Sequence, residues 1–401
     1  MAESDSERKA HLREDRPRAP VEDDKFEPRP GGHAPQRDIE QGTETAEPKV
    51  TVRKRDLKDV WQLADDLRDE LHEISDGDLV ARIVRTAVKL LRDDTNRGDL
   101  KLYDNAFREL RYSMKVFAPY RDKLKISIFG SARTPSDAPD YKLAEQFGED
   151  MEKAGWMIIT GAGGGIMAAG HGGAGAKGSF GLNISLPFEQ SANEFIENDP
   201  KLVDFKYFFT RKLMFVRSSH AVALFPGGFG TMDEGFEVLT LIQTGKCPPM
   251  PLVMVDHEGS DYWSGWDHYV RNHLLKDGLI SEQDLHLYTL THDIDEAARI
   301  CEKFYENYHS LRYTRDLIIL RLQRKVSDKQ LDVIAEAFND IVDKTAAERM
   351  KQQTWRSCGP LKVERNEAKL RHLHRLVFPF NRRDHGRLRQ LIDHLNDLPE
   401  A

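Results

Sequence analysis

Apolar and polar positions follow different periods in different parts of the chain. Between residues 52 and 121, apolar side chains recur every three or four positions, which is the period of an amphipathic helix. The positions with this period are Val60, Leu63, Leu67 and Leu71, followed by Leu79, Ile83, Ala87 and Leu91. We therefore predict a helical extension over residues 51–121. An accessory layer or a dimer element is favoured for it over a regulatory cap.

From Lys125 onward, short apolar runs alternate with amphipathic segments. The runs that predict strands are LKISIFG (124–130), WMIITGAGGG (156–165), SFGLNISLP (179–187), HAVALFPGG (220–228) and MPLVMVD (250–256). Helical patterns such as YKLAEQFGEDMEKAG (141–155) and TMDEGFEVLTLI (231–242) separate them. This alternation predicts an α/β fold, a Rossmann-like doubly wound parallel sheet over residues 122–312. Ligands bind such sheets outside the carboxyl ends of the strands.

A different order of elements follows. RDLIILRLQR (315–324), GPLKVER (359–365) and HRLVFPFN (374–381) predict strands, and SDKQLDVIAEAFNDIV (327–342) and DHGRLRQLIDHLN (384–396) predict helices. We expect a small α+β accessory domain over residues 313–401. Its basic residues include Arg371, His372, His374, Arg375, Arg382 and Arg383. They indicate either a solvated basic face or a site for an anionic effector such as a polyphosphorylated nucleotide.

Composition limits what kind of protein this is. Residues 1–50 are rich in Pro, Glu, Asp and Arg without an apolar period, so we predict a disordered tail there. No apolar stretch reaches the roughly 18 to 20 residues that span a bilayer, and we expect a cytoplasmic protein without a membrane partner. The net charge of -8 makes nucleic acid a poor candidate partner, and three scattered cysteines indicate neither a metal site nor a disulfide framework.

Glycine-rich turns follow the predicted strands. FPGGFGTMDE (225–234) holds Gly227, Gly228 and Gly230, and TGAGGGIMAAG (160–170) holds Gly163 and Gly164. Because glycine tolerates positive φ and has no Cβ, such turns let backbone N–H groups converge on a phosphate at a helix amino terminus. FGSAR (129–133) adds Ser131 as a hydroxyl donor, and Thr231 is expected to cap the helix after the first turn.

Two other phosphate motifs do not fit. A dinucleotide fingerprint counted from Gly161 would need glycine where Ile166 stands, which disfavours NAD. A Walker A loop would need Ser or Thr after Lys177, where the chain has Gly178.

Charged residues flank the glycine turns. Asp233, Glu234 and Glu237 lie in the first turns of the predicted helix, where acids also stabilise the helix dipole. Arg211 and Lys212 lie just upstream of the preceding strand. A carboxylate and an arginine beside a phosphate cradle are the groups that chemistry on a sugar phosphate needs.

The motif PGGFGTMDE, with TRK at residues 210–212, resembles the LONELY GUY (LOG) family, long misannotated as lysine decarboxylases. The resemblance covers roughly residues 120–305. It implies a Rossmann-like fold, assembly as homodimers or higher homo-oligomers, and hydrolysis of the N-glycosidic bond of nucleoside 5′-monophosphates. No metal or organic cofactor is implied.

The resemblance also assigns roles to individual residues. It implies that Glu234 and Arg211 are the catalytic pair, with Glu234 held ionised by the nearby Arg211 guanidinium. The substrate phosphate would be bound by Gly227, Gly228, Gly230 and Thr231. Gly163, Gly164, Ser131 and Lys212 complete the predicted binding site.

Phe208 and Phe209 stand where the short plant-type pattern has Met-His, and Phe215 replaces a later methionine. We therefore expect a general nucleoside monophosphate nucleosidase, with AMP preferred as substrate, rather than an enzyme dedicated to cytokinin riboside 5′-monophosphates. Two further hypotheses remain. One is a noncatalytic nucleotide or molybdenum-cofactor binding protein, and the other is an interaction protein in which the flanking segments matter most.

Overall fold

The computed structural model describes residues 76–185, 192–350 and 354–399, together with Gln62, Asp66, Leu71 and Ile74. The predicted disordered tail over residues 1–50 lies outside the described residues. All described residues belong to one compact unit, Ala46–Ala401. The predicted domain boundaries inside it stay predictions. None of the described helices is long and apolar enough to cross a membrane.

Helices occupy the described part of the predicted extension. They are α2 (Gly77–Arg92), α3 (Arg97–Phe117) and the short 3-10 helix η2 (Ala118–Tyr120). Helix α3 begins with a side-chain cap, because Asn96 Oδ1 accepts a hydrogen bond from Asp99 N–H. The prediction of helices is confirmed from Gly77 onward.

The central sheet has seven strands in the order β4-β3-β2-β1-β5-β6-β7, and every pair is parallel. The strands are β1 (Lys125–Phe129), β2 (Met157–Thr160), β3 (Ser179–Ile184), β4 (Leu202–Phe205), β5 (Ala221–Leu224), β6 (Leu252–Val255) and β7 (Thr289–Thr291). The predicted doubly wound sheet is confirmed. The sequence missed β4 and β7, because these edge strands are short and only partly buried and lack a continuous apolar run.

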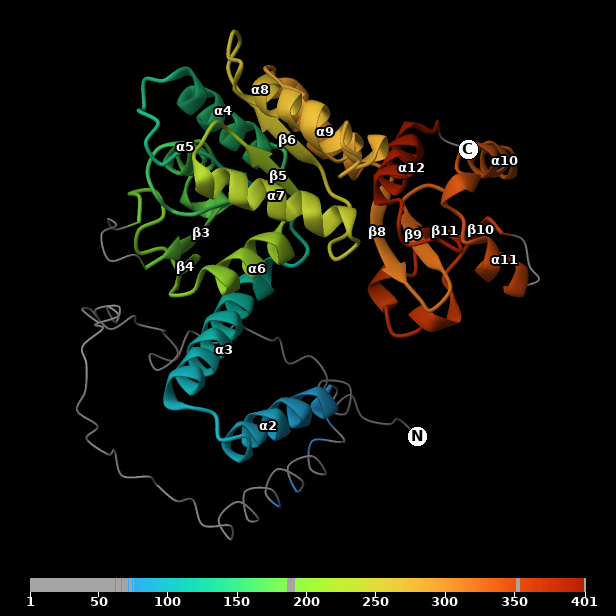
Figure 1. Ribbon diagram of the computed structural model, residues 1–401, viewed down its shortest axis with the longest axis horizontal. Helices are drawn as coiled ribbons and strands as arrows, with labels where there is room; N and C mark the ends of the chain where they lie inside the picture. The colour runs from blue at the N-terminus through green and yellow to red at the C-terminus, as the bar shows by residue number, and fades with distance from the viewer. Residues whose placement is uncertain are drawn as a thin grey trace, which may run out of the picture. The chain divides into compact units, whose positions relative to one another are not determined.

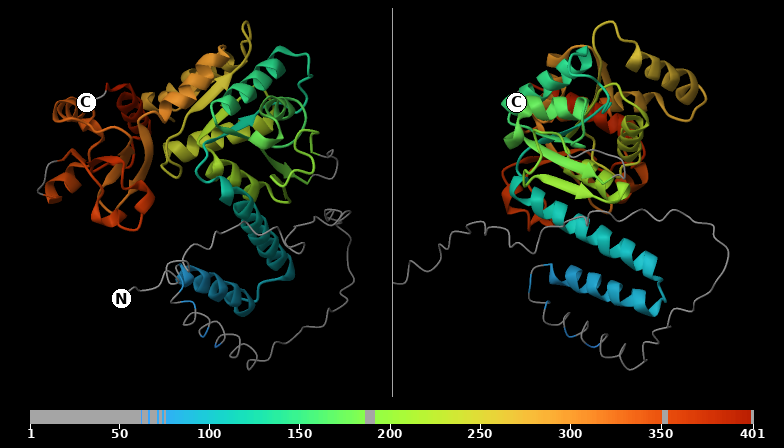
Figure 2. Two further views of the ribbon diagram at one scale, coloured as in Figure 1. Left: turned by 180° about the vertical axis from the view of Figure 1, so that it is seen from behind. Right: turned by 90° about the vertical axis from the view of Figure 1, so that its left-hand side faces the viewer.

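Helices cover both faces of this sheet (Figures 1 and 2). One face packs against α4 (Pro139–Lys153), α5 (Ile166–Ala174) and α9 (Ile294–Phe304). The other packs against α3, α6 (Phe208–Ser218), α7 (Phe229–Gln243) and α8 (Tyr262–Tyr269). Shorter helical segments are η3 (Ala176–Gly178), η4 (Val270–Leu275) and η5 (Glu282–Leu287).

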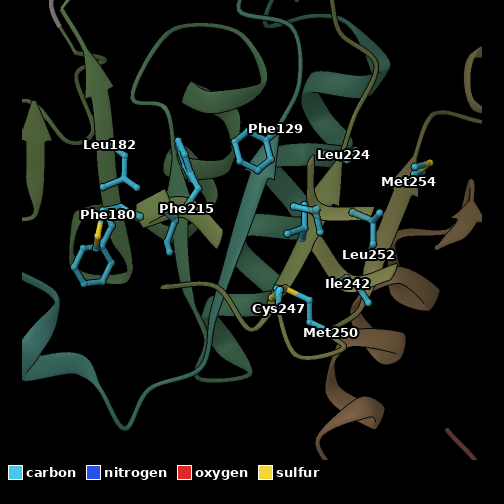
Figure 3. Close-up of a cluster of buried hydrophobic side chains, with 14 of the residues drawn as sticks. Phe129, Phe180, Leu182, Phe215, Leu224, Ile242, Cys247, Met250, Leu252 and Met254 are labelled. Atoms are coloured by element: carbon cyan, nitrogen blue, oxygen red, sulfur yellow. The ribbon is translucent and has the colours of Figure 1, made fainter. Parts of the chain in front are cut away.

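Side chains of each strand alternate between two cores, as the pleat requires. On β1, Ile128 belongs to the core under α4, α5 and α9, whereas Phe129 belongs to the core under α6 and α7. Figure 3 shows the second core, where the Phe129 and Phe215 rings meet edge to face with centroids 4.7 Å apart. Burial on both faces explains why the predicted strands are nearly continuous apolar runs.

A second sheet follows, with four antiparallel strands in the order β10-β11-β9-β8. They are β8 (Tyr308–Tyr313), β9 (Ile318–Leu322), β10 (Arg356–Cys358) and β11 (His374–Phe378). The helical segments are α10 (Asp328–Ala337), η6 (Asn339–Ile341), α11 (Lys344–Met350), η7 (Lys362–Glu364), η8 (Ala368–Leu370) and α12 (His385–Asp397). The predicted strand 359–365 is wrong, because η7 occupies it. The sequence analysis also missed β8, a strand of this sheet that begins before residue 313, the predicted start of the accessory domain.

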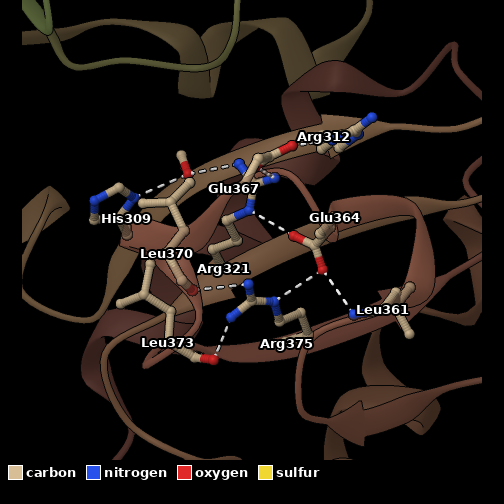
Figure 4. A network of polar contacts seen from close by, with 10 residues as sticks. His309, Arg312, Arg321, Leu361, Glu364, Glu367, Leu370, Leu373 and Arg375 are labelled. Atoms are coloured by element: carbon tan, nitrogen blue, oxygen red, sulfur yellow. Dashed lines mark hydrogen bonds and ion pairs between the residues drawn. The ribbon is translucent and has the colours of Figure 1, made fainter.

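A buried ion network explains why residues 359–365 are not a strand (Figure 4). Glu364 is 2% exposed and its carboxylate accepts hydrogen bonds from Arg321 at 2.8 Å and Arg375 at 3.1 Å. The turn of η7 is needed to bring Glu364 onto both guanidinium groups and onto Leu361 N–H. Burial alone would raise the pKa of Glu364, but hydrogen bonds from Leu361 N–H, Arg375 and Arg321 outweigh it and lower the pKa.

The same network bears on the predicted effector residues. The side chain of Arg375 is 0% exposed, so it belongs to the interior and not to a solvated basic face. Arg382 lies at the surface and donates to the carbonyl groups of Thr314 and Arg315. The effector site itself stays a prediction.

Candidate functional site

A cavity of about 690 Å³ opens at the carboxyl ends of the central strands. It lies beside the point where the strand order reverses between β1 and β5, which is where doubly wound sheets bind ligands. Its lining includes Ser131, Gly163, Gly164, Arg211, Gly228, Gly230, Thr231 and Glu234. The structure thus brings the three predicted turns, the arginine and the glutamate to one cavity.

The glycines after β5 matter because they have no side chain, and not because they adopt unusual backbone angles. Gly228 has φ −89° and ψ −157°, and among the described residues the positive-φ glycines do not include Gly227, Gly228 or Gly230. A Cβ on Gly227 would lie 2.1 Å from Thr231 Oγ1, whereas a Cβ on Gly228 or Gly230 would meet no atom within 4 Å. The expectation of positive φ is wrong. Gly227 permits close packing of the turn, and the other two leave room for a ligand.

Thr231 is not the cap of the helix after this turn. Helix α7 begins at Phe229 with Gly228 as its N-cap, so Thr231 lies inside the first turn, 5% exposed and on the cavity wall. The helix begins after Gly228, so its N-cap lies three residues before the threonine that the capping preference suggested. The first N–H groups of an α-helix have no intrahelical acceptor and form an anion site. The first N–H groups of α7 lie at this cavity.

Backbone hydrogen bonds join the turn after β1 to the other two. Ser131 N–H donates to Pro226 O at 3.0 Å, and Ile166 N–H donates to Ser131 O at 3.0 Å. Ser131 Oγ accepts from Arg133 N–H at 3.0 Å, which orients the hydroxyl group. The three turns therefore form one connected wall, and their N–H groups are held in fixed relative positions.

Arg211 is held against the cavity by carbonyl groups. Its Nε donates to Leu182 O at 2.7 Å and its Nη2 to Gly161 O at 3.4 Å, while the guanidinium lies 5.3 Å from the Phe215 ring centroid. A Cβ at Gly161 would lie 2.4 Å from Arg211 Nη2. Gly161 is therefore required for the arginine to reach this position.

Glu234 is a buried carboxylate on the cavity wall. It is 7% exposed, and its Oε2 has no hydrogen-bond partner among the described residues. The nearest cation in an ion pair with it is Lys212, with Nζ 3.8 Å from Oε2. Burial raises the pKa of Glu234 to about 7, against the lowering effect of Lys212 and Arg211 and with a further rise from Glu237. Arg211 lowers the pKa of Glu234, in the expected direction, but desolvation is the larger effect.

Two predicted binding residues lie behind the cavity wall rather than on it. Lys212 Nζ pairs with Glu237 Oε2 at 2.6 Å and with Asp233 Oδ2 at 3.0 Å. Burial acts to lower the pKa of Lys212, but these hydrogen bonds outweigh it and raise the pKa. Gly227 also lies behind the wall, and its carbonyl accepts from Tyr262 OH at 2.5 Å. Lys212 and Gly227 support the wall from behind, which sequence spacing could not distinguish from direct contact.

The sequence missed other lining residues. Asn183 lies on the wall, and its Nδ2 donates to Asp204 Oδ1 at 2.8 Å. It is the one amide side chain in the run SFGLNISLP, near the carboxyl end of β3, which is a signal that could have identified it. Met167 and Phe208 also line the cavity, and Phe208 remains 51% exposed.

Part of the chain is similar to known proteins. Residues 165–301 match a family model described as "Possible lysine decarboxylase". A cytokinin riboside 5′-monophosphate phosphoribohydrolase of Mycobacterium tuberculosis is 28% identical over 173 residues, which are 42% of this chain and 89% of that protein.

Solved structures with similar folds are more distant. A molybdenum cofactor carrier protein of Chlamydomonas reinhardtii has 18% identity and a TM-score of 0.32, over 44% of this chain and 93% of that chain. A DNA processing protein A of Helicobacter pylori has 17% identity and a TM-score of 0.32, over 45% of this chain and 81% of that chain.

Proposed function

We propose that this chain, which belongs to the LONELY GUY family, hydrolyses the N-glycosidic bond of nucleoside 5′-monophosphates to the free base and ribose 5-phosphate. The observation that carries the proposal is the position of Glu234. It is a buried carboxylate whose Oε2 has no hydrogen-bond partner among the described residues, on the wall of a cavity that is also lined by glycine turns and Arg211.

The glycine turns would bind the 5′-phosphate. The amino terminus of α7, the open positions Gly228 and Gly230, and the Ser131 hydroxyl meet at the cavity. Backbone N–H groups at a helix start favour an anion without adding a side chain that fills the space. Binding energy from the phosphate would fix the anomeric carbon relative to Glu234, although the phosphate does not react.

Glu234 would act on the reacting carbon and on water. As the bond from the anomeric carbon to the base nitrogen breaks, its electron pair leaves with the base and positive charge develops on the ribose. The Glu234 carboxylate would stabilise that charge and accept a proton from the water whose oxygen bonds to the anomeric carbon. The departing base nitrogen would take up a proton from solvent, and Glu234 would release its proton to solvent, so that free base and ribose 5-phosphate result. A pKa of about 7 suits a group that accepts and returns a proton near neutral pH.

We propose AMP as the preferred substrate. Phe208 presents a half-exposed ring at the cavity, and an aromatic face stacks on an unmodified purine. Phe209 is not a lining residue and stacks instead on Tyr207, with centroids 5.4 Å apart. The comparison of AMP, GMP, CMP, UMP and an N6-isoprenoid AMP by kcat/KM tests this preference.

The activity is tested by incubating purified protein with this nucleotide panel and measuring free base and ribose 5-phosphate by chromatography. Glu234→Gln should abolish turnover while AMP binding by calorimetry is retained. The matched control is Glu302→Gln, an exposed glutamate on α9, which covers the opposite face of the sheet. AMP binding without turnover by the wild-type protein would refute hydrolysis and support a noncatalytic nucleotide-binding protein.

A further inference from the structure

A buried carboxylate of the helical extension reaches the helix that carries Arg211. Glu109 on α3 is 1% exposed, and it shares one face of that helix with the buried residues Ser113 and Phe117. Phe117 stacks on Phe180 of β3, with ring centroids 4.3 Å apart and an interplanar angle of 10°. This contact fixes the carboxyl end of α3 on the sheet. Glu109 lies two turns earlier, where α3 runs beside α6 (Figures 1 and 2).

Both oxygens of Glu109 accept hydrogen bonds at the start of α6. Oε1 accepts from Lys206 N–H at 2.9 Å, and Oε2 accepts from Thr210 Oγ1 at 2.5 Å. Helix α6 begins at Phe208, and its own N-cap residue, Tyr207, makes no side-chain capping bond. Glu109 does not accept from the first N–H groups of α6, but it ties the residue before the N-cap and the Thr210 side chain to α3. It also places a carboxylate near the positive end of the helix dipole.

One of the residues that Glu109 contacts is adjacent to Arg211 in the sequence. Thr210 precedes Arg211, and Arg211 N–H donates to Tyr207 O at 3.3 Å within this first turn. The guanidinium of Arg211 must also meet Leu182 O and Gly161 O, so a shift of the turn would displace it from both carbonyl groups. A misplacement of about 1 Å at a positioning group is enough to cost about 100-fold in rate.

We propose that Glu109 is a positioning residue for Arg211, so that the helical extension is part of the active site and not a separate layer. The inference rests on the proposed function for its kinetic consequence. Glu109 does not line the cavity and acts only through the first turn of α6.

The structure predicts different results for two substitutions. Glu109→Ala removes both acceptors and leaves the buried Thr210 hydroxyl without this carboxylate, and we expect kcat/KM to fall by about tenfold or more. Glu109→Gln keeps one acceptor for Lys206 N–H, and its amide can donate to Thr210 Oγ1, so activity should return to within a few-fold of wild type. Asp104→Ala is the matched control, because Asp104 is an exposed acid on the same helix and its side chain is 58% exposed.

A double-mutant cycle distinguishes positioning from general destabilisation. If Glu109 acts through Arg211, Glu109→Ala should change the residual activity of an Arg211→Ala protein by less than about twofold. If Glu109→Ala lowers kcat/KM by the same factor in the wild-type and the Arg211→Ala proteins, the proposal is overturned. It is also overturned if Glu109→Ala lowers kcat/KM of the wild type no more than Asp104→Ala does.

Hydrogen exchange supplies a readout that does not need turnover. Amides of residues 206–212 should exchange faster in Glu109→Ala than in wild type and Asp104→Ala, and slowly again in Glu109→Gln. Unchanged exchange in Glu109→Ala would overturn the positioning role even if the wild type is active. If the wild type releases no base from any nucleotide, the proposed function fails, and the exchange result still decides the role of Glu109.

Discussion

Glu234 should destabilise the folded protein at the pH where it works. Its ordinary pKa is 4.5 and burial raises it to about 7. The difference corresponds to about 3 kcal/mol, because each pKa unit is about 1.4 kcal/mol of free energy. We therefore predict that Glu234→Gln, which keeps the size and removes the charge, raises the free energy of unfolding by up to about 3 kcal/mol at pH 8.

The sign follows from the direction of the shift. The pKa of Glu234 is higher in the folded than in the unfolded protein, so the folded state favours the protonated form. The stability that this preference gives the folded protein is fully present below pH 4.5 and is lost as the pH rises through about 7. The stability gained by Glu234→Gln should therefore be largest at pH 8 and below about 1 kcal/mol at pH 5.

Urea denaturation of the two proteins at pH 5 and pH 8 measures this difference. Glu302→Gln serves as the control, because Glu302 is an exposed glutamate outside the cavity lining. A gain of equal size at both pH values, or a loss at pH 8, would refute the conclusion that Glu234 is held in an environment that disfavours its charge.

Three further outcomes are expected. With AMP, kcat/KM should rise with pH through about 7, because Glu234 must be ionised to accept a proton. At pH 6 it should be about a tenth of its value on the plateau at high pH. A flat profile from pH 6 to 8 would contradict this. Gly228→Ala should fold with wild-type stability but raise KM for AMP, because its Cβ would occupy space left for the ligand. Gly227→Ala should lower the thermal midpoint of unfolding, because its Cβ would meet Thr231. Equal midpoints for the two variants would contradict these different roles of the two glycines. Glu364→Ala should cost about 3 to 5 kcal/mol in urea unfolding, because it leaves the buried Arg375 guanidinium without its carboxylate and Arg321 with Glu367 alone. A loss below about 1 kcal/mol would show that the network adds little.

Local sequence determined the central sheet and the turns. Continuous apolar runs such as AVAL and LVMV predict strands buried on both faces, and that burial is an average property of a few consecutive residues. In a parallel sheet, turns at the carboxyl ends of neighbouring strands reach the same edge, so the meeting of Ser131, Gly163 and Gly228 could be anticipated. The short edge strands and β8 escaped detection because their residues are polar or only partly buried.

Only the tertiary structure decided how the charged groups behave. The adjacent residues Arg211 and Lys212 separate, because Arg211 lies on the cavity wall whereas Lys212 pairs with Asp233 and Glu237. The pKa of Glu234 depends on how much water the surrounding helices and strands exclude, and Glu109 reaches Thr210 across 101 positions of sequence. Solvation and long-range hydrogen bonds arise from groups that meet only after folding, so no local pattern specifies them.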